Sequence, residues 1–223
     1  MSFLRKVGAI TWKDALTELR TKEVVFTVFV FAILVIVIFN FAFGTDQETV
    51  ALVGPGILWV TFAFSGVLSL NRAFIHERES GCLEGLMAAP ISREAIYVGK
   101  MLGSLISMLV VEAIALPIFA LLFDLPVFSL ALIVTTLLAT IGFVAVGTLF
   151  SALAVNTRAR DMVLPILFLP VVVPVIISAV KASGLALTGG SWGEIMGWLQ
   201  IIVAFDAIFI VVCFLVFGYV IEE

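Results

Sequence analysis

Two carboxylates stand inside the long apolar runs of this sequence, Glu112 and Asp206. An unpaired carboxylate is costly in hydrocarbon, so each side chain is expected to face other helices, a partner or water. The chemistry open to them is either a role in a substrate path or gate, or packing as a protonated or hydrogen-bonded group. The residues alone favour packing for both.

The sequence contains no nucleotide-binding loop. A P-loop needs the pattern G-x-x-x-x-G-K-[ST], whose backbone amides surround phosphates. Gly99-Lys100 is the only Gly-Lys pair, but Glu94 stands in the position of the first glycine and Met101 follows the lysine. We therefore expect no catalytic residues in this chain. Any ATP-driven work must come from a partner that binds ATP.

The residues that usually hold heme iron or other metals are sparse. His76 is the only histidine, and Cys82 and Cys213 are the only cysteines. Heme iron is usually held by His, Cys, Met or Tyr. His76 lies beside the charged residues 77–79, which predicts a solvated or interface side chain. We expect no metal site and no cofactor bound by this chain alone.

The amino-acid composition indicates what class of protein contains these residues. Hydrophobic residues make up 63% and charged residues 13% of the 223 positions, and the mean hydropathy is +1.27. Soluble domains average about 45–50% apolar and about 25% charged residues, and a soluble fold of this size would not hide so much apolar surface. A soluble enzyme, a secreted disulfide scaffold and a disordered chain are excluded. The net charge of −4 gives no basis for nucleic-acid binding.

Long apolar runs predict an all-α integral membrane protein with six transmembrane helices in a single transmembrane domain, residues 1–223. A helix needs about 20 residues to cross the hydrocarbon core. Helices satisfy their own backbone hydrogen bonds there, which isolated strands and loops do not. The expected spans are 24–43, 50–75, 101–123, 127–155, 162–180 and 198–221.

The basic residues predict the orientation of these spans. Eleven of the twelve Lys and Arg residues fall in the connections on one side, and Lys181 alone falls on the other. Cytoplasmic loops carry the excess of basic residues in membrane proteins. We therefore expect a multi-pass protein of the cell inner (cytoplasmic) membrane with both termini in the cytoplasm.

Residues 1–23 predict a separate helix that lies in the interface of the lipid bilayer. Leu4, Trp12 and Leu16 fall on one side of such a helix, and Lys6 and Lys13 fall on the other. This arrangement suits apolar contact with lipid and lysines near anionic headgroups. The alternative is a solvated start of the first span.

The connection 76–100 is long for a chain in which another connection, 124–126, has only three residues. Leu83, Leu86 and Met87 recur at helical spacing and predict a short helix with an apolar face. That face needs burial, either in a groove of another protein or on the membrane surface. Composition alone leaves both alternatives open.

Three motifs in this chain resemble the heme exporter protein B (CcmB) family. Residues 54–60 read GPGILWV, and residues 81–87 read GCLEGLM, followed by Pro90 and Lys100. The fifth span is similar as well, with its prolines in the stretch 169–174. The resemblance covers nearly the whole chain, and 81–100 is its most specific part.

This resemblance implies the permease subunit of an ABC transporter in cytochrome c maturation, with the exporter-type fold of six helices per subunit. It implies a cytoplasmic coupling helix that docks on a separate, CcmA-like ATPase. It also implies a homodimer and a CcmC-like heme-handling membrane subunit that supplies the heme-ligating histidines, with heme as the cargo of the complex. The implied coupling residues are Gly81, Leu83, Glu84, Leu86, Met87 and Pro90.

Two other functions stay open at this point. A related exporter would carry a drug, a lipid or a polysaccharide instead of heme. A scaffold would organise a heme-handling complex without moving anything, because the chain offers one histidine and two membrane carboxylates as candidate ligands.

Two glycine pairs, Gly99-x-x-x-Gly103 and Gly193-x-x-x-Gly197, have the spacing that permits close helix approach. In a chain with 17 glycines such matches also arise by chance. No helix contact is predicted from them.

The orientation can be tested with a reporter that is active only outside the cytoplasm. Fused after Asp46, the reporter should be active, because the connection around this residue carries no Lys or Arg. Fused after Glu84, it should be inactive. Reporter activity in whole cells measures both positions, and the opposite pattern would overturn the predicted topology.

Overall fold

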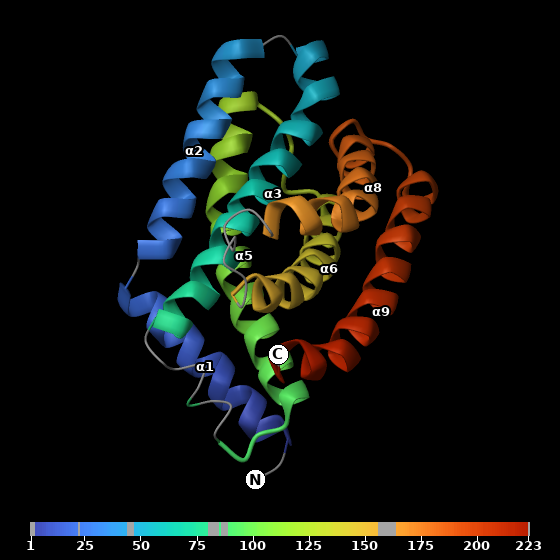
Figure 1. Ribbon diagram of the computed structural model, residues 1–223. Coiled ribbons are helices and arrows are strands. Elements are labelled where there is room, and N and C mark those ends of the chain that lie inside the picture. Colours follow the sequence, from blue (N-terminus) through green and yellow to red (C-terminus); the bar gives the residue numbers. More distant parts are fainter. Residues whose placement is uncertain are drawn as a thin grey trace.

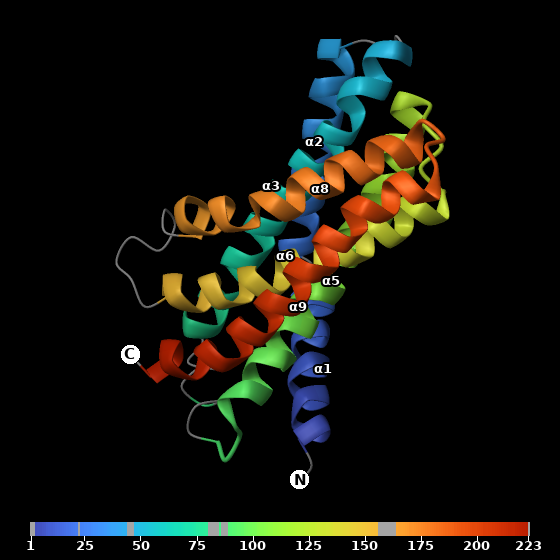
Figure 2. The same ribbon diagram turned by 90° about the vertical axis from the view of Figure 1, so that its right-hand side faces the viewer.

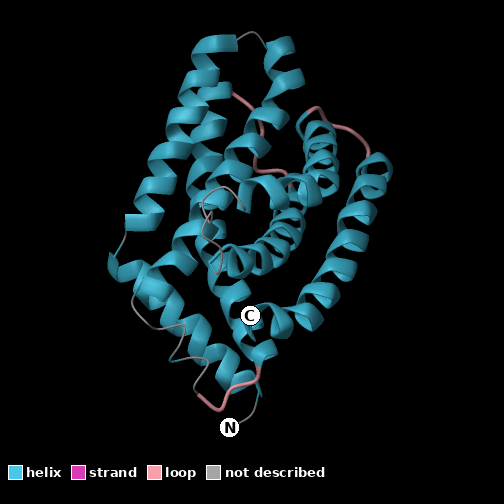
Figure 3. Cartoon of the chain, in the orientation of Figure 1, coloured by secondary structure: helices cyan, strands magenta, loops and turns pink. Residues whose placement is uncertain are grey.

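The computed structural model of the chain is built from helices (Figures 1 and 3). It describes residues 3–21, 23–43, 47–79, 85, 89–155 and 164–222. Over these residues the fold is all-α, which confirms the expected fold class. The elements are α1 (Phe3–Thr21), α2 (Glu23–Phe43), α3 (Gln47–Glu79), α5 (Arg93–Phe123), α6 (Leu130–Val155), the π-helix η1 (Leu164–Phe168), α8 (Leu169–Leu187) and α9 (Trp192–Glu222).

Six of these helices are long and apolar enough to cross a membrane, as expected. The chain is therefore a multi-pass membrane protein. The helices differ from their expected bounds by up to eight residues: α5 begins at Arg93 and not at 101. α8 continues to Leu187 and includes Lys181, and α9 already begins at Trp192.

Local hydrogen bonds explain why α8 and α9 meet in a tight turn. Ser191 and Glu194 form a reciprocal cap at the start of α9: the Ser191 amide donates to Glu194 Oε2 at 3.0 Å, and the Glu194 amide donates to Ser191 Oγ at 3.4 Å. At the end of α8, the Gly190 amide donates to Leu185 O at 2.7 Å, and Gly189 has a φ of +76°. A search for apolar runs misses these polar first and last turns.

α6 is the central helix of the bundle (Figure 2), and it packs against α3, α5, α8 and α9. Every residue of α6 from Gly142 to Leu149 is buried. Gly142, Ala145 and Gly147 in this stretch allow the neighbouring helices to approach closely, as small residues do in membrane helix packing.

The contact between α3 and α6 is built from two reciprocal pairs. A Cβ atom placed on Gly66 of α3 would lie 2.4 Å from the ring of Phe143 on α6. A Cβ atom placed on Gly147 of α6 would lie 2.3 Å from Leu70 Cδ1 on α3. Each helix therefore provides a glycine that receives a large side chain of the other.

This packing predicts that one methyl group added at Gly66 lowers the stability of the protein. Gly66→Ala should lower the unfolding temperature of the purified protein in detergent, because overpacking a well-filled core costs about 1–3 kcal/mol. Gly56→Ala is the matched control on the same helix, since no atom lies within 4 Å of a Cβ at Gly56. Equal unfolding temperatures for both variants would contradict the reciprocal packing.

Candidate functional site

Most of the expected coupling residues lie outside the residues that the structure describes: Gly81, Leu83, Glu84, Leu86 and Met87. Their role stays a prediction. Pro90 is described and exposed. The candidate site is therefore described from the two helices that flank residues 81–90. These are α3, which ends at Glu79, and α5, which begins at Arg93.

The start of α5 fixes where the segment ends. Ser92 has extended backbone angles, φ −69° and ψ 145°, directly before the helix. Its carbonyl accepts the first helical hydrogen bonds, from the amides of Ala95 at 3.0 Å and Ile96 at 3.3 Å. The segment thus ends at Pro90, three positions before α5 begins at Arg93.

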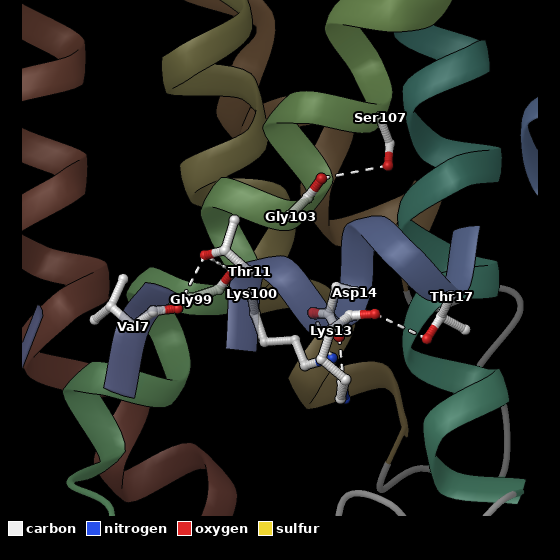
Figure 4. Close-up of polar contacts among 9 residues, drawn as sticks. All are labelled: Val7, Thr11, Lys13, Asp14, Thr17, Gly99, Lys100, Gly103 and Ser107. Atoms are coloured by element: carbon white, nitrogen blue, oxygen red, sulfur yellow. Dashed lines mark hydrogen bonds and ion pairs between the residues drawn. The ribbon is translucent and has the colours of Figure 1, made fainter. Parts of the chain in front are cut away.

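The N-terminal helix contacts both the end of this segment and α5. Lys6 Nζ of α1 donates a hydrogen bond to the carbonyl of Pro90. Further along α1, the Thr11 hydroxyl donates to Gly99 O on α5 at 3.1 Å. Figure 4 shows α1 crossing α5 at this point, with the Thr11 side chain beside Gly99 and the Lys100 side chain reaching toward Asp14.

Two glycines of α5 make this crossing close. A Cβ atom on Gly99 would lie 2.7 Å from Ile10 Cβ, and a Cβ atom on Gly103 would lie 3.0 Å from Asp14 Cβ. One turn of α5 therefore receives one turn of α1, in the manner of small-residue membrane contacts. The spacing Gly99-x-x-x-Gly103, from which no contact was predicted, is used here. Gly193 and Gly197 of the second pair are exposed instead.

An ion pair between buried Lys100 and half-buried Asp14 lies between the two glycines. Lys100 Nζ is 2.9 Å from Asp14 Oδ2, and the Lys100 side chain is only 5% exposed (Figure 4). Lys13 Nζ, on the exposed side, is 3.0 Å from the other carboxylate oxygen of Asp14. We name Ile10, Thr11, Asp14, Gly99, Lys100 and Gly103 the α1–α5 joint.

Sequence reasoning missed this joint because it counted Lys100 among the basic residues of the connection 76–100. The structure instead places Lys100 within α5, 4% exposed. The available signal was the repeat at four-residue spacing in both segments: Ile10 and Asp14 on α1, Gly99 and Gly103 on α5. Only the structure brings the two repeats together.

The two membrane carboxylates lie elsewhere, and both contact α6. Thr140 Oγ1 donates a hydrogen bond of 2.7 Å to Glu112 Oε1 of α5. A Cβ atom on Gly142 would lie 2.0 Å from Asp206 Oδ1 of α9. Successive helix residues are about 100° apart, so Thr140 and Gly142 face opposite sides of α6. The structure therefore does not bring Glu112 and Asp206 into one site.

Each of these carboxylates is only partly satisfied. Glu112 is 2% and Asp206 is 7% exposed. Within the described residues, Glu112 Oε2 and Asp206 Oδ1 have no hydrogen-bond partner. In the same part of the chain, no group of three or more His, Cys, Asp and Glu side chains is placed to hold a metal ion. The packing role of Glu112 and Asp206, which the sequence favours over a role in a substrate path, stays a prediction.

Similar proteins cover most of the length of the chain. The sequence profile of the family described as CcmB protein matches residues 5–222. The heme exporter protein B of Rhodobacter capsulatus is 35% identical over 163 residues, 70% of this chain and 75% of that protein. The heme exporter protein B of Haemophilus influenzae is 32% identical over 179 residues, 77% of this chain and 79% of that protein.

The contact of Asp206 with α6 predicts a rescue. Gly142→Ala should lower the unfolding temperature in detergent, because the new methyl group overlaps the Asp206 carboxylate. Asp206→Ala in the same chain should restore much of the loss, whereas Asp206→Asn, which keeps the volume, should not. Gly197→Ala on α9 is the control, since nothing lies within 4 Å of a Cβ there. A loss that Asp206→Ala leaves unchanged would rule out this contact as its cause.

Proposed function

The chain belongs to the CcmB protein family, and on this premise we propose that it is the permease subunit of an ATP-driven complex for c-type cytochrome biogenesis. Curated relatives that share most of its length carry the name heme exporter protein B. The observation that carries the proposal is the match of the family profile to residues 5–222, which include all six membrane-competent helices.

In this proposal the segment 81–90 is the docking site for a separate ABC ATPase on the cytoplasmic side. Leu83, Leu86 and Met87 share one helix face and enter a groove of the ATPase together. Glu84 lies beside that face and accepts a charge-assisted hydrogen bond. Pro90 ends the segment, and α5 begins three residues later, at Arg93, and carries the movement into the membrane.

The other parts of the complex follow from the same reasoning. The ATPase binds ATP, a second copy of this chain completes the membrane path, and a heme-handling subunit supplies heme ligands. Heme is the cargo, either exported or released from its chaperone. The complex lies in the inner membrane with both termini of this chain in the cytoplasm, as the distribution of Lys and Arg supports.

α1 serves as an interfacial helix in this arrangement. Leu4 and Trp12 are 78% and 68% exposed, whereas Val7 and Ile10, on the side that meets α5, are 5% and 3% exposed. The exposed apolar face suits lipid at the headgroup boundary. The start of α1 therefore lies beside the docking segment at the membrane surface, as the hydrogen bond from Lys6 to Pro90 supports.

Two substitutions in the docking segment test the proposal. Leu83→Asp and Glu84→Lys should leave the chain in the membrane at near-normal levels. Both should abolish association with the ATPase and formation of holocytochrome c, because loss of one buried leucine contact costs about 2–5 kcal/mol. Copurification of the ATPase and holocytochrome c yield are the measurements. Gly56→Ala is the control, since Gly56 lies on α3 outside the docking segment and no atom lies within 4 Å of a Cβ there.

The outcome also separates the alternatives. ATPase association at wild-type yield with Leu83→Asp would show that the segment lies on the membrane surface. In liposomes that contain the chain and its ATPase, ATP-dependent heme movement across the bilayer would exclude a scaffold. ATP hydrolysis without heme movement would favour the scaffold, and movement of another substrate alone would favour a different exporter.

A further inference from the structure

We propose that the ion pair between Asp14 and Lys100 joins α1 to α5 in one fixed register, so that both helices move as one unit when the segment 81–90 is displaced. Lys100 is then a positioning residue for coupling. The inference rests on the proposed function, because it names the part of the permease that receives the movement of the ATPase.

The joint lies close to where the movement would enter. Lys100 is the eighth residue of α5, so it lies about 10 Å along the helix from its start. Lys6 contacts the last residue of the segment, and Thr11 and Asp14 contact α5 one and two turns further on. α1 therefore follows the segment and α5 over a continuous line of contacts.

The use of an ion pair at this contact indicates that Asp14 and Lys100 fix the register of α1 along α5, and do not only stabilise the contact. Gly99 and Gly103 already let Ile10 and α1 pack closely on α5, and an apolar pair would hold such a contact at least as firmly. A buried ion pair is seldom more stabilising than a well-packed apolar pair, but it can specify one arrangement. Sliding α1 along α5 would separate the Lys100 ammonium, 5% exposed, from the Asp14 carboxylate.

A second contact links α2 to the C-terminal end of α5. Asn40 Nδ2, near the end of α2, donates a hydrogen bond of 2.7 Å to Leu122 O near the end of α5. α2 also packs along α5 and α3. Because α1 precedes α2 with only residue 22 between them, the pair α1 and α2 is held to α5 at both ends. Movement of α5 then carries α2 with it.

Lys13 and Lys100 both pair with the Asp14 carboxylate, so variants of the two lysines can be compared directly. Lys100→Met should leave association with the ATPase and ATP hydrolysis intact, but should lower the heme moved or released per ATP at least tenfold. Lys13→Met should stay within twofold of the wild type, because Lys13 pairs with Asp14 at a side chain that is 40% exposed. The measurement is made on the purified complex with its ATPase in liposomes. Equal coupling in both variants would overturn the inference.

A disulfide tests the same point if Lys100→Met fails to fold. Asp14→Cys and Gly103→Cys are combined in a chain that also carries Cys82→Ser and Cys213→Ser. The Cβ atoms at positions 14 and 103 are 3.0 Å apart, and disulfides average about 3.8 Å, so a small shift closes the bond. The oxidised complex holds α1 on α5 without the ion pair, and the reduced complex has neither link.

We expect coupling near the wild-type ratio in the oxidised complex and at least a tenfold loss after reduction. Full coupling in the reduced complex, or loss of coupling on oxidation, would overturn the inference, the latter because α1 would then have to slide on α5. Failure of the wild-type chain to bind the ATPase would instead overturn the proposed function. The two failures are therefore distinguishable.

Discussion

The absence of water from the hydrocarbon core is the constraint on which the whole structure depends, because every backbone donor and acceptor there needs a partner inside the protein. Long helices meet this need within each segment. Pro55, Pro117 and Pro174 stand inside three of them and each remove one donor. Side-chain hydroxyls also form hydrogen bonds within their own helix: Thr61, Thr135 and Thr148 each donate to the carbonyl four residues before.

Among the described residues, polar contacts between helices link particular pairs of elements. Trp59 Nε1 donates to Ser183 Oγ at 2.9 Å and joins α3 to α8. The Tyr97 hydroxyl donates to Ala145 O at 3.0 Å and joins α5 to α6. The ion pair of Lys100 joins α5 to α1. Between these points the helices touch through glycine and large apolar side chains, so the polar contacts select which arrangement the close packing takes.

The sequence was sufficient for the fold class because membrane crossing depends on length and composition, which are local properties. The cap of Ser191 and Glu194 was also readable, since its two residues are three positions apart. The partner of Lys100 was not, because Asp14 lies on another helix and either residue reads as an ordinary charge near a membrane surface. The same reason applies to Asp206, whose neighbour Gly142 has no side chain to reveal the contact. The roles of Leu83 and Glu84 are predictions that rest on spacing and resemblance.

The turn between α8 and α9, from Thr188 to Ser191, has a consequence for biosynthesis. Two apolar helices with so short a connection enter the bilayer as a hairpin, because one of them cannot wait outside while the other crosses. In the bundle, α9 then packs against both α8 and α6. A chain that stops before Trp192 would therefore lack the helix against which α8 and α6 pack, and would leave those faces of both helices without their partner.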